Sequence, residues 1–269
     1  MPRATINGTE LYYEDVGGGD ATVVFSHGLL WDGRMFDPQV KALADRYRCI
    51  TYDHRGQGRS EVPPESSIPM DLLYADAVAL IEHLDAAPCH FVGLSMGGFT
   101  AMRVAARRPD LLSSLVLLET SAQPEDPANV PKYRALTAIT RFLGPGLVTG
   151  QVMPIMFGQT FLNDPGREEE RERWKTILSG NRKDVYKAVN GVIERNGIEE
   201  EIASIDVPTL VMVGEEDVAT PPDKAEFIAA TIPDAKLVRI PRAGHTSTIE
   251  QAGAVNDALT DWLSTHAGA

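Results

Sequence analysis

The chain has 269 residues, of which 43% are apolar and 23% are charged, as in an ordinary soluble globular protein. Its 25 basic and 38 acidic residues give a net charge of −13, which argues against a binder of nucleic acids or anionic membranes, because both need basic surface. The N-terminus lacks the apolar core of a signal peptide, and no apolar run approaches the roughly 18 residues of a membrane span.

The first part of the chain alternates between strands and helices. The Asn-Gly pair at 7–8 is a strong turn signal and predicts a hairpin between residues 3–6 and 9–15. Such alternation predicts a mostly parallel sheet covered by helices on both faces. Further strands are predicted at 21–26, 48–52, 90–93 and 111–118, and helices at 36–45, 70–84 and 96–108.

The pattern changes between residues 123 and 205, where the chain is mostly helical. Helices are predicted there at 130–142, 146–153, 167–178 and 183–195. The alternation then resumes with strands at 209–213 and 236–240 and helices at 222–231 and 252–266. We therefore expect one α/β core, formed by residues 1–122 and 206–269, with residues 123–205 inserted into it, because each half of the sheet needs the other to be buried.

A serine flanked by glycines stands where a predicted strand meets a predicted helix. In Gly93-Leu94-Ser95-Met96-Gly97, the glycines leave room for a turn too sharp for side chains at those two positions. The Ser95 hydroxyl would then stand at the head of a helix, where free N–H groups favour developing negative charge. Ser95 is the candidate nucleophile. Gly98 is expected to allow close helix packing behind the turn.

A serine nucleophile needs a base, and the base needs a carboxylate to orient it. His245 follows the last predicted strand, at the sheet edge where ligands bind. Glu215, Glu216 and Asp217 follow the preceding strand, so all three are candidate acids. The order serine, acid, histidine is the one found in hydrolases of this type.

The oxyanion of a tetrahedral intermediate needs N–H donors. The amide of Met96, directly after the serine, is one candidate donor. The loop HGLLW after the strand at 21–26 offers the amide of Leu29 as the second, and Gly28 permits the tight turn. His27 is expected to hold this loop rather than to react.

Together these features resemble the α/β-hydrolase superfamily. The motifs are SHG at 26–28, DHRGQGRS at 53–60, GLSMGG at 93–98, GxxDxxxP at 214–221 and AGH at 243–245. The resemblance implies the α/β-hydrolase fold and identifies Asp217 as the acid and His245 as the base. It also implies a structural role for the 53–60 loop, with Asp53 paired to Arg55 and His54 as a loop residue without a chemical role.

Within the superfamily, the serine at position 95 separates the chain from haloalkane dehalogenases and epoxide hydrolases, which carry aspartate there. The chain is similar to small esterases, enol-lactonases such as 3-oxoadipate enol-lactonase, and cofactor-free haloperoxidases. This resemblance implies an enzyme that cleaves esters or lactones through an acyl-enzyme, without a cofactor or metal. The alternatives are a perhydrolase or haloperoxidase, a C–C bond hydrolase with the same triad, and a non-catalytic receptor. Neither the natural substrate nor the oligomeric state follows from the sequence.

By the same resemblance, residues 123–205 form a cap over the nucleophile. Met156, Phe157 and, outside the cap, Trp31 are the candidates for lining the substrate pocket. The run REEERER at 167–173 is expected to be a solvated helix face with i,i+4 charge pairs. Other apolar residues are expected to pack the cap's own core: Phe142, Leu143, Met153, Phe161, Leu162 and Trp174.

The remaining cysteines and histidines give no catalytic signal. Cys49 and Cys89 each begin an apolar run and are expected to be buried, reduced thiols. His83, His90 and His266 are expected on the solvated surface. With the leader-free N-terminus, these features favour a cytoplasmic enzyme.

Overall fold

A computed structural model describes residues 2–266 and contains one sheet of eight strands in the order β1-β2-β4-β3-β5-β6-β7-β8. The predicted mostly parallel sheet is confirmed, since β4, β3 and β5 to β8 run parallel and only β1 and β2 are antiparallel to their neighbours. The strands are β1 (Arg3–Ile6), β2 (Thr9–Val16), β3 (Thr22–Ser26), β4 (Arg48–Tyr52), β5 (Cys89–Leu94), β6 (Leu112–Leu118), β7 (Thr209–Gly214) and β8 (Lys236–Ile240).

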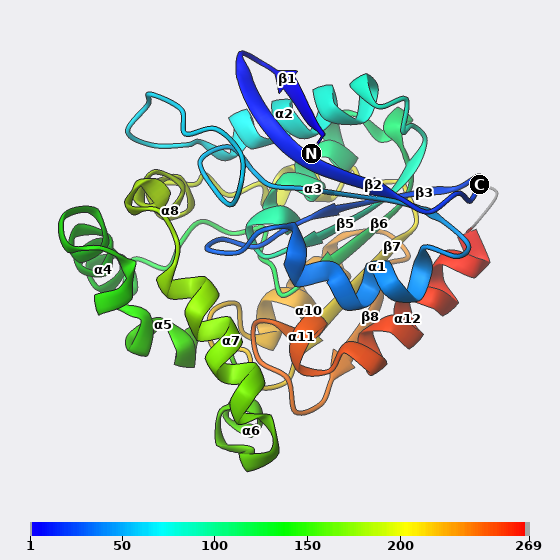
Figure 1. Ribbon diagram of the computed structural model, residues 1–269. Helices are drawn as coiled ribbons and strands as arrows, with labels where there is room; N and C mark the ends of the chain where they lie inside the picture. Colours follow the sequence, from blue (N-terminus) through cyan, green and yellow to red (C-terminus); the bar gives the residue numbers. More distant parts are fainter. Residues whose placement is uncertain (1, 267–269) are drawn as a thin grey trace.

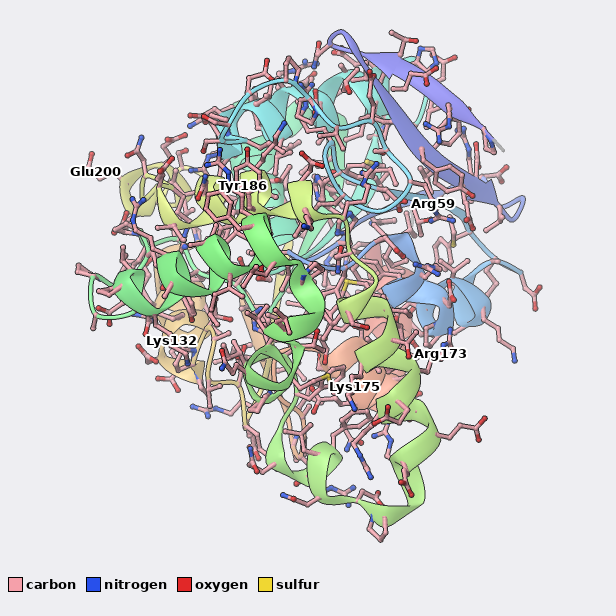
Figure 2. All side chains as sticks on the ribbon, turned by 60° about the vertical axis from the view of Figure 1, so that its left-hand side comes forward. Arg59, Lys132, Arg173, Lys175, Tyr186 and Glu200 are labelled. Carbon is pink, nitrogen blue, oxygen red and sulfur yellow. The ribbon has the colours of Figure 1, made fainter. Side chains whose placement is uncertain are left out.

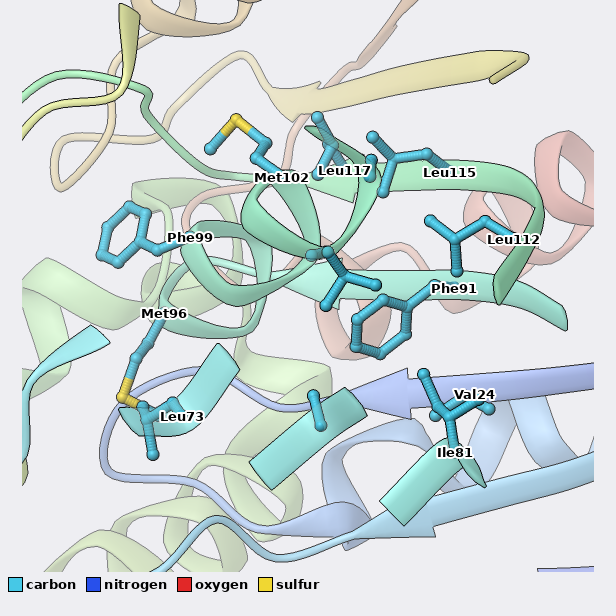
Figure 3. Packing of buried hydrophobic residues seen from close by; sticks show 14 of the residues in the cluster. Val24, Leu73, Ile81, Phe91, Met96, Phe99, Met102, Leu112, Leu115 and Leu117 are labelled. Carbon is cyan, nitrogen blue, oxygen red and sulfur yellow. The ribbon is translucent and has the colours of Figure 1, made fainter. Parts of the chain in front are cut away.

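Helices cover both faces of this sheet (Figure 1). On one face, α2 (Met70–His83), α3 (Met96–Arg107) and α10 (Pro222–Thr231) pack through one apolar cluster. Figure 3 shows part of it, with Phe91 of β5 lying near Val24 of β3. On the other face, α1 (Asp37–Leu43) and α12 (Ala252–His266) pack through a second cluster. The prediction of helices on both faces is therefore confirmed.

Between β6 and β7 the chain is helical and contains no strand. This part lies to one side of the sheet, in green to yellow-green in Figure 1. Arg173 and Lys175 project from α7 (Figure 2), and their side chains are 60% and 50% exposed. The helices are α4 (Val130–Leu143), α5 (Thr149–Met156), α6 (Gln159–Asn163), α7 (Glu168–Ser179), α8 (Tyr186–Ile193) and α9 (Glu199–Ile202).

The expected solvated face at 167–173 differs in its pairing. Arg167 pairs with Glu170, and Lys175 with Glu172, at i,i+3 spacing rather than i,i+4. Arg167, directly before α7, also donates to the backbone oxygens of Glu250 and Ile249 in α11 (Ser247–Glu250). The expected cap core includes Phe161 and Trp174, whereas Phe142 and Leu143 are 69% and 64% exposed and lie outside it.

The strand order places two loops side by side. From β3 the chain crosses to β4 on one side, and β5 then pairs with β3 on the other side. The carboxyl ends of β3 and β5 therefore flank the point where the strand order reverses, which is where ligands bind in sheets of this kind. The loops that follow carry Leu29 and Ser95.

Candidate active site

Ser95 lies in the turn between β5 and α3 in a strained backbone conformation. Its φ is 53° and its ψ is −112°, a region that side chains disfavour. The turn is held from both sides, because the Ser95 N–H donates to the Leu118 oxygen at 2.9 Å and the Thr120 hydroxyl donates to the Ser95 oxygen at 2.9 Å. These bonds anchor the turn to the end of β6.

The glycines around Ser95 are required by close packing. A Cβ at Gly93 would overlap the backbone of Gly97, and a Cβ at Gly97 would overlap the carbonyl oxygen of Ser26. Both neighbours are backbone atoms that cannot rotate away, which agrees with the steric reading of the motif. A Cβ at Gly98 would collide with the Thr120 side chain. Gly98 therefore makes room for a side chain in the segment after β6, not for a neighbouring helix.

Ser95, His245 and Asp217 form one chain of hydrogen bonds. Ser95 Oγ lies 2.9 Å from His245 Nε2, and His245 Nδ1 lies 2.9 Å from Asp217 Oδ2. The Ser95 and His245 residues are 8% and 4% exposed, so the pair is shielded but open to the adjoining cavity. Residues from the ends of β5, β7 and β8 thus meet at one edge of the sheet.

Asp217 alone among the three acidic candidates reaches the histidine. Its Oδ1 accepts the amide N–H groups of Ala219 and Thr220 at 2.8 and 3.1 Å, and its Oδ2 accepts the Thr220 hydroxyl at 2.9 Å. Glu216 accepts instead from the Thr160 amide at 2.8 Å. Glu215 is exposed. Thr220, which the sequence reasoning did not single out, therefore helps to orient the carboxylate.

The amides of Leu29 and Met96 have no acceptor among residues 2–266. Gly28 lies close to Ser95, since a Cβ there would be 3.5 Å from Ser95 Cβ. Gln57 connects the two segments, because its Oε1 accepts the Leu30 N–H at 2.9 Å and its Nε2 lies 3.6 Å from Met96 Sδ. Its motif position gave no hint of this link.

The expected Asp53–Arg55 pair is wrong. Asp53 accepts from Gly33 and from the backbone and side chain of Arg59, whereas Arg55 pairs with Asp76 of α2. The reason is the local turn, in which Gly56 and Gly58 have φ values of 77° and 50°. The reversal returns Arg59 to Asp53 and leaves Arg55 facing α2.

Three histidines outside the Ser95 site are buried. His27 Nδ1 donates to the Gly28 oxygen at 2.7 Å, and Nε2 accepts the His54 N–H at 2.9 Å, so His27 joins two loops. Burial lowers the pKa of both His27 and His54. His90 is 2% exposed, and its expected surface position is wrong. Its Nδ1 lies 2.8 Å from Ser114 Oγ, and burial lowers its pKa to about 4.

A mostly apolar cavity lies over Ser95 and His245. Met156 and Leu29 both line this cavity. Trp31 and Phe157 do not line it, so their expected pocket positions are wrong. The Trp31 ring packs edge-on against Phe157 and Trp174, with centroids 5.8 and 5.4 Å apart. These rings form an apolar core behind the cavity wall, because the loop turns Trp31 inward.

Two buried glutamates beside the site were missed by the sequence reasoning. Glu250 accepts hydrogen bonds from the N–H groups of Gly158, Gly244 and Thr246 at 2.8, 3.0 and 3.2 Å. It therefore binds the backbone of the residues directly before and after His245. Glu119 follows β6 and accepts the Gly214 N–H at 3.1 Å. Burial raises the pKa of both carboxyls, and the Asp217 charge raises that of Glu119 further. Neither lies in a motif that marks a buried acid.

The described chain offers neither a membrane-spanning helix nor a metal cluster. Between residues 2 and 266, none of the helices combines the length and apolar character that a membrane span needs. In the same range, no three histidine, cysteine, aspartate or glutamate side chains are placed to hold a metal ion.

Comparisons with known proteins give a consistent family. Residues 21–252 match the family model described as alpha/beta hydrolase fold. An esterase from Thermogutta terrifontis is 32% identical, with a TM-score of 0.90 over 98% of both chains. The enol-lactonase of Burkholderia xenovorans LB400 is 30% identical, with a TM-score of 0.90 over 98% of this chain and 100% of its own. The provisionally named non-heme bromoperoxidase BpoC of Mycobacterium tuberculosis is 31% identical over 94% of this chain and 97% of its own.

Proposed function

Because the chain belongs to the alpha/beta hydrolase fold family, we propose that it is a serine hydrolase that cleaves carboxylic esters or lactones through an acyl-enzyme. The observation that carries this proposal is the continuous path from Ser95 Oγ through His245 to Asp217, with both links at 2.9 Å. The relatives named as an esterase and an enol-lactonase support the choice of bond.

In the first half-reaction, His245 Nε2 takes the proton of Ser95 as its oxygen attacks the substrate carbonyl carbon. The amides of Leu29 and Met96 donate to the oxyanion, and Asp217 stabilises the imidazolium through Nδ1–H. When the intermediate collapses, His245 gives its proton to the leaving alkoxide, and Ser95 stays acylated. Water, deprotonated by His245, then attacks the acyl group and releases the acid.

We also propose that residues 123–205 act as a cap that shapes the substrate cavity. Met156 of α5 lines that cavity, which lies over Ser95. The substrate is a small molecule with substantial apolar surface, since most of the lining is apolar. The two buried, unpaired cysteines, Cys49 and Cys89, are compatible with a reducing, cytoplasmic location.

Hydrolysis of p-nitrophenyl esters of increasing chain length, beside lactones and enol-lactones, tests this function. Ser95→Ala is expected to lower kcat by a factor on the order of 10⁴ to 10⁶. Ser247→Ala is the matched control, because Ser247 is buried two residues beyond His245 and its hydroxyl forms no hydrogen bond within the described chain. Ester hydrolysis by the Ser95→Ala protein at the wild-type rate would refute the assignment.

The similarity to BpoC favours one second candidate. In a perhydrolase, hydrogen peroxide replaces water in the attack on the acyl-enzyme, and the resulting peracid oxidises halide. Bromination of monochlorodimedone in acetate and peroxide tests this activity. Bromination that depends on Ser95 and exceeds ester hydrolysis would make the perhydrolase the better assignment.

A further inference from the structure

One wall of the cavity over Ser95 carries a buried ion pair that the proposed reaction does not use. Arg195 and Glu125 both line the cavity, and Arg195 Nη1 lies 2.8 Å from Glu125 Oε2. Their side chains are only 6% and 10% exposed. Glu125 precedes α4 and Arg195 follows α8, so the pair belongs to the proposed cap.

Arg195 is fixed in place but not fully satisfied. Its Nε donates to the Gln123 oxygen at 3.1 Å, and its Nη1 donates to the Val192 oxygen at 2.9 Å as well as to Glu125. Its Nη2 finds no acceptor among residues 2–266. A guanidinium has five N–H donors, so Nη2 is free to donate into the cavity. The side chain is therefore arranged to donate to something that enters the cavity.

A second polar group lines the same cavity. Tyr133 of α4 has a hydroxyl for which the described chain supplies no hydrogen-bond partner. Burial and the nearby Glu125 carboxylate raise the pKa of Tyr133 to about 12. At neutral pH its hydroxyl is thus uncharged and can both donate and accept.

These groups lie close to the reacting serine. The Arg195 guanidinium carbon is 4.4 Å from the ring centroid of Phe99, and Phe99 is one helical turn beyond Ser95, about 6 Å along the axis. A substrate held at Ser95 that extends along this cavity past Phe99 therefore reaches Arg195.

The charge balance selects the kind of group that binds there. The Glu125 carboxylate neutralises the Arg195 charge, so a substrate carboxylate would gain no net attraction and would face Glu125. A neutral oxygen can accept from Arg195 Nη2 and exchange a hydrogen bond with Tyr133. A plain hydrocarbon that displaces water from these two groups would leave both of them unpaired.

Resting on the proposed function, we infer that the natural substrate carries a second, uncharged oxygen, in a hydroxyl or ketone group, a few carbons from the scissile carbonyl, and that Arg195 and Tyr133 bind it. They are specificity-determining residues, not part of the bond-breaking machinery. The site thus takes hydroxy- or oxo-substituted esters or lactones in preference to plain aliphatic ones.

Matched pairs of substrates test this inference. One pair is p-nitrophenyl hexanoate and its ω-hydroxy analogue, and the other is hexyl acetate and ω-hydroxyhexyl acetate, which together cover the acyl and alcohol halves. In at least one pair the wild-type enzyme should favour the hydroxylated ester by about three- to tenfold in kcat/KM, the usual net effect of one hydrogen bond. The measured quantity is this ratio, not the absolute rate.

Tyr133→Phe and Arg195→Lys should each bring the ratio toward one. Arg195→Lys keeps a positive charge opposite Glu125 but removes Nη2. Tyr186→Phe is the control, because Tyr186 lies on α8 in the same helical segment (Figure 2) but does not line the cavity, and it should leave the ratio unchanged. Should Arg195→Lys fail to fold, Tyr133→Phe decides alone.

Two results would overturn the inference. One is a ratio near one in both pairs. The other is a preference for the adipate half-ester, which carries a carboxylate at the chain end, over the hydroxylated ester. Either result, obtained while hydrolysis still depends on Ser95, would reject the polar subsite and leave the proposed serine hydrolase standing. Hydrolysis that does not depend on Ser95 would reject the proposed function itself.

Discussion

Ser95 combines backbone strain with several restraints, and this combination favours a functional over a structural residue. A φ of 53° is unfavourable for a side chain, and glycine would relieve the strain. The conformation is held by hydrogen bonds to Leu118 and Thr120 and by glycines where backbones meet. These restraints hold the Ser95 hydroxyl in a fixed position that faces His245.

Glu250 is expected to position His245 without touching the substrate. It accepts from Gly244 and Thr246 on either side of the histidine, and from Gly158 beyond the cavity-lining Met156. Glu250→Gln replaces one acceptor oxygen with an NH₂ group that faces donors. We expect kcat to fall by up to about 100-fold, because a small displacement of a catalytic group is enough for such a loss.

The kinetic pattern distinguishes positioning from general damage. The loss in kcat for Glu250→Gln should be similar for short and long esters, with a smaller change in KM, and Glu250→Asp should restore part of it. Glu169→Gln, an exposed change on α7, should leave kcat unchanged. Wild-type kcat in Glu250→Gln would contradict the positioning role.

At the scale of elements, the turn between β5 and α3 should tolerate no added side-chain volume. In Gly97→Ala the new Cβ would overlap the Ser26 oxygen, which belongs to β3 beside β5. We expect the free energy of unfolding to fall by about 3 kcal/mol, at the upper end of overpacking effects. Urea unfolding followed by circular dichroism measures it.

Gly150→Ala is the matched control for that substitution. Gly150 lies in α5, and a Cβ added there would have no atom within 4 Å, so alanine should raise the free energy of unfolding by about 0.4–1 kcal/mol. A Gly97→Ala protein as stable as the wild type would show that the turn can relax.

The strands and the longer helices were predictable from the sequence, whereas the shortest helices were not. The predicted bounds of β4, α10, β8 and α12 match the structure. Helices of four or five residues, such as α6, α9 and α11, are too short to show a helical periodicity. The helix predicted at 146–153 lies instead at Thr149–Met156 and includes Pro154.

The candidate site also contains features that were predictable from the sequence and features that were not. Backbone-determined features such as the glycines of the turn follow from steric rules, and the strand order brings Ser95, Asp217 and His245 to one edge. Side-chain directions within loops do not follow from a sequence pattern. Trp31 therefore turned out to pack behind the cavity, and the partner of Arg55 lies outside its own loop.

At the scale of the whole molecule, buried histidines make stability depend on pH. His90 has a pKa of about 4 in the folded protein, below the ordinary value of 6.5. The unfolded chain therefore binds this proton first as the pH falls. The stabilising effect of the neutral ring is complete above pH 6.5 and is lost between about 6.5 and 4, by on the order of 3 kcal/mol in total.

Urea unfolding at a series of pH values tests this dependence. His90→Asn should flatten the decline of the unfolding free energy below pH 6.5, whereas His83→Asn, an exposed change on α2, should leave its slope unaltered.

The buried Glu119 changes the stability with pH in the opposite direction. Its raised pKa means that its contribution is complete at low pH and is lost as the pH rises through the folded value, so Glu119→Gln should stabilise the protein at alkaline pH. For His90, the same slope of unfolding free energy against pH in His90→Asn and in the wild type would contradict its assigned contribution to the pH dependence.

The role of Ser95 as the nucleophile is tested by locating the covalent adduct of a fluorophosphonate on the intact protein. Peptide mass spectrometry should find one adduct, on Ser95, and its formation should stop in Ser95→Ala and slow strongly in His245→Ala. Labelling should also be prevented by an ester substrate in excess. An adduct on another residue, or rapid ester hydrolysis by protein that takes up no label, would contradict the assignment of Ser95 as the nucleophile.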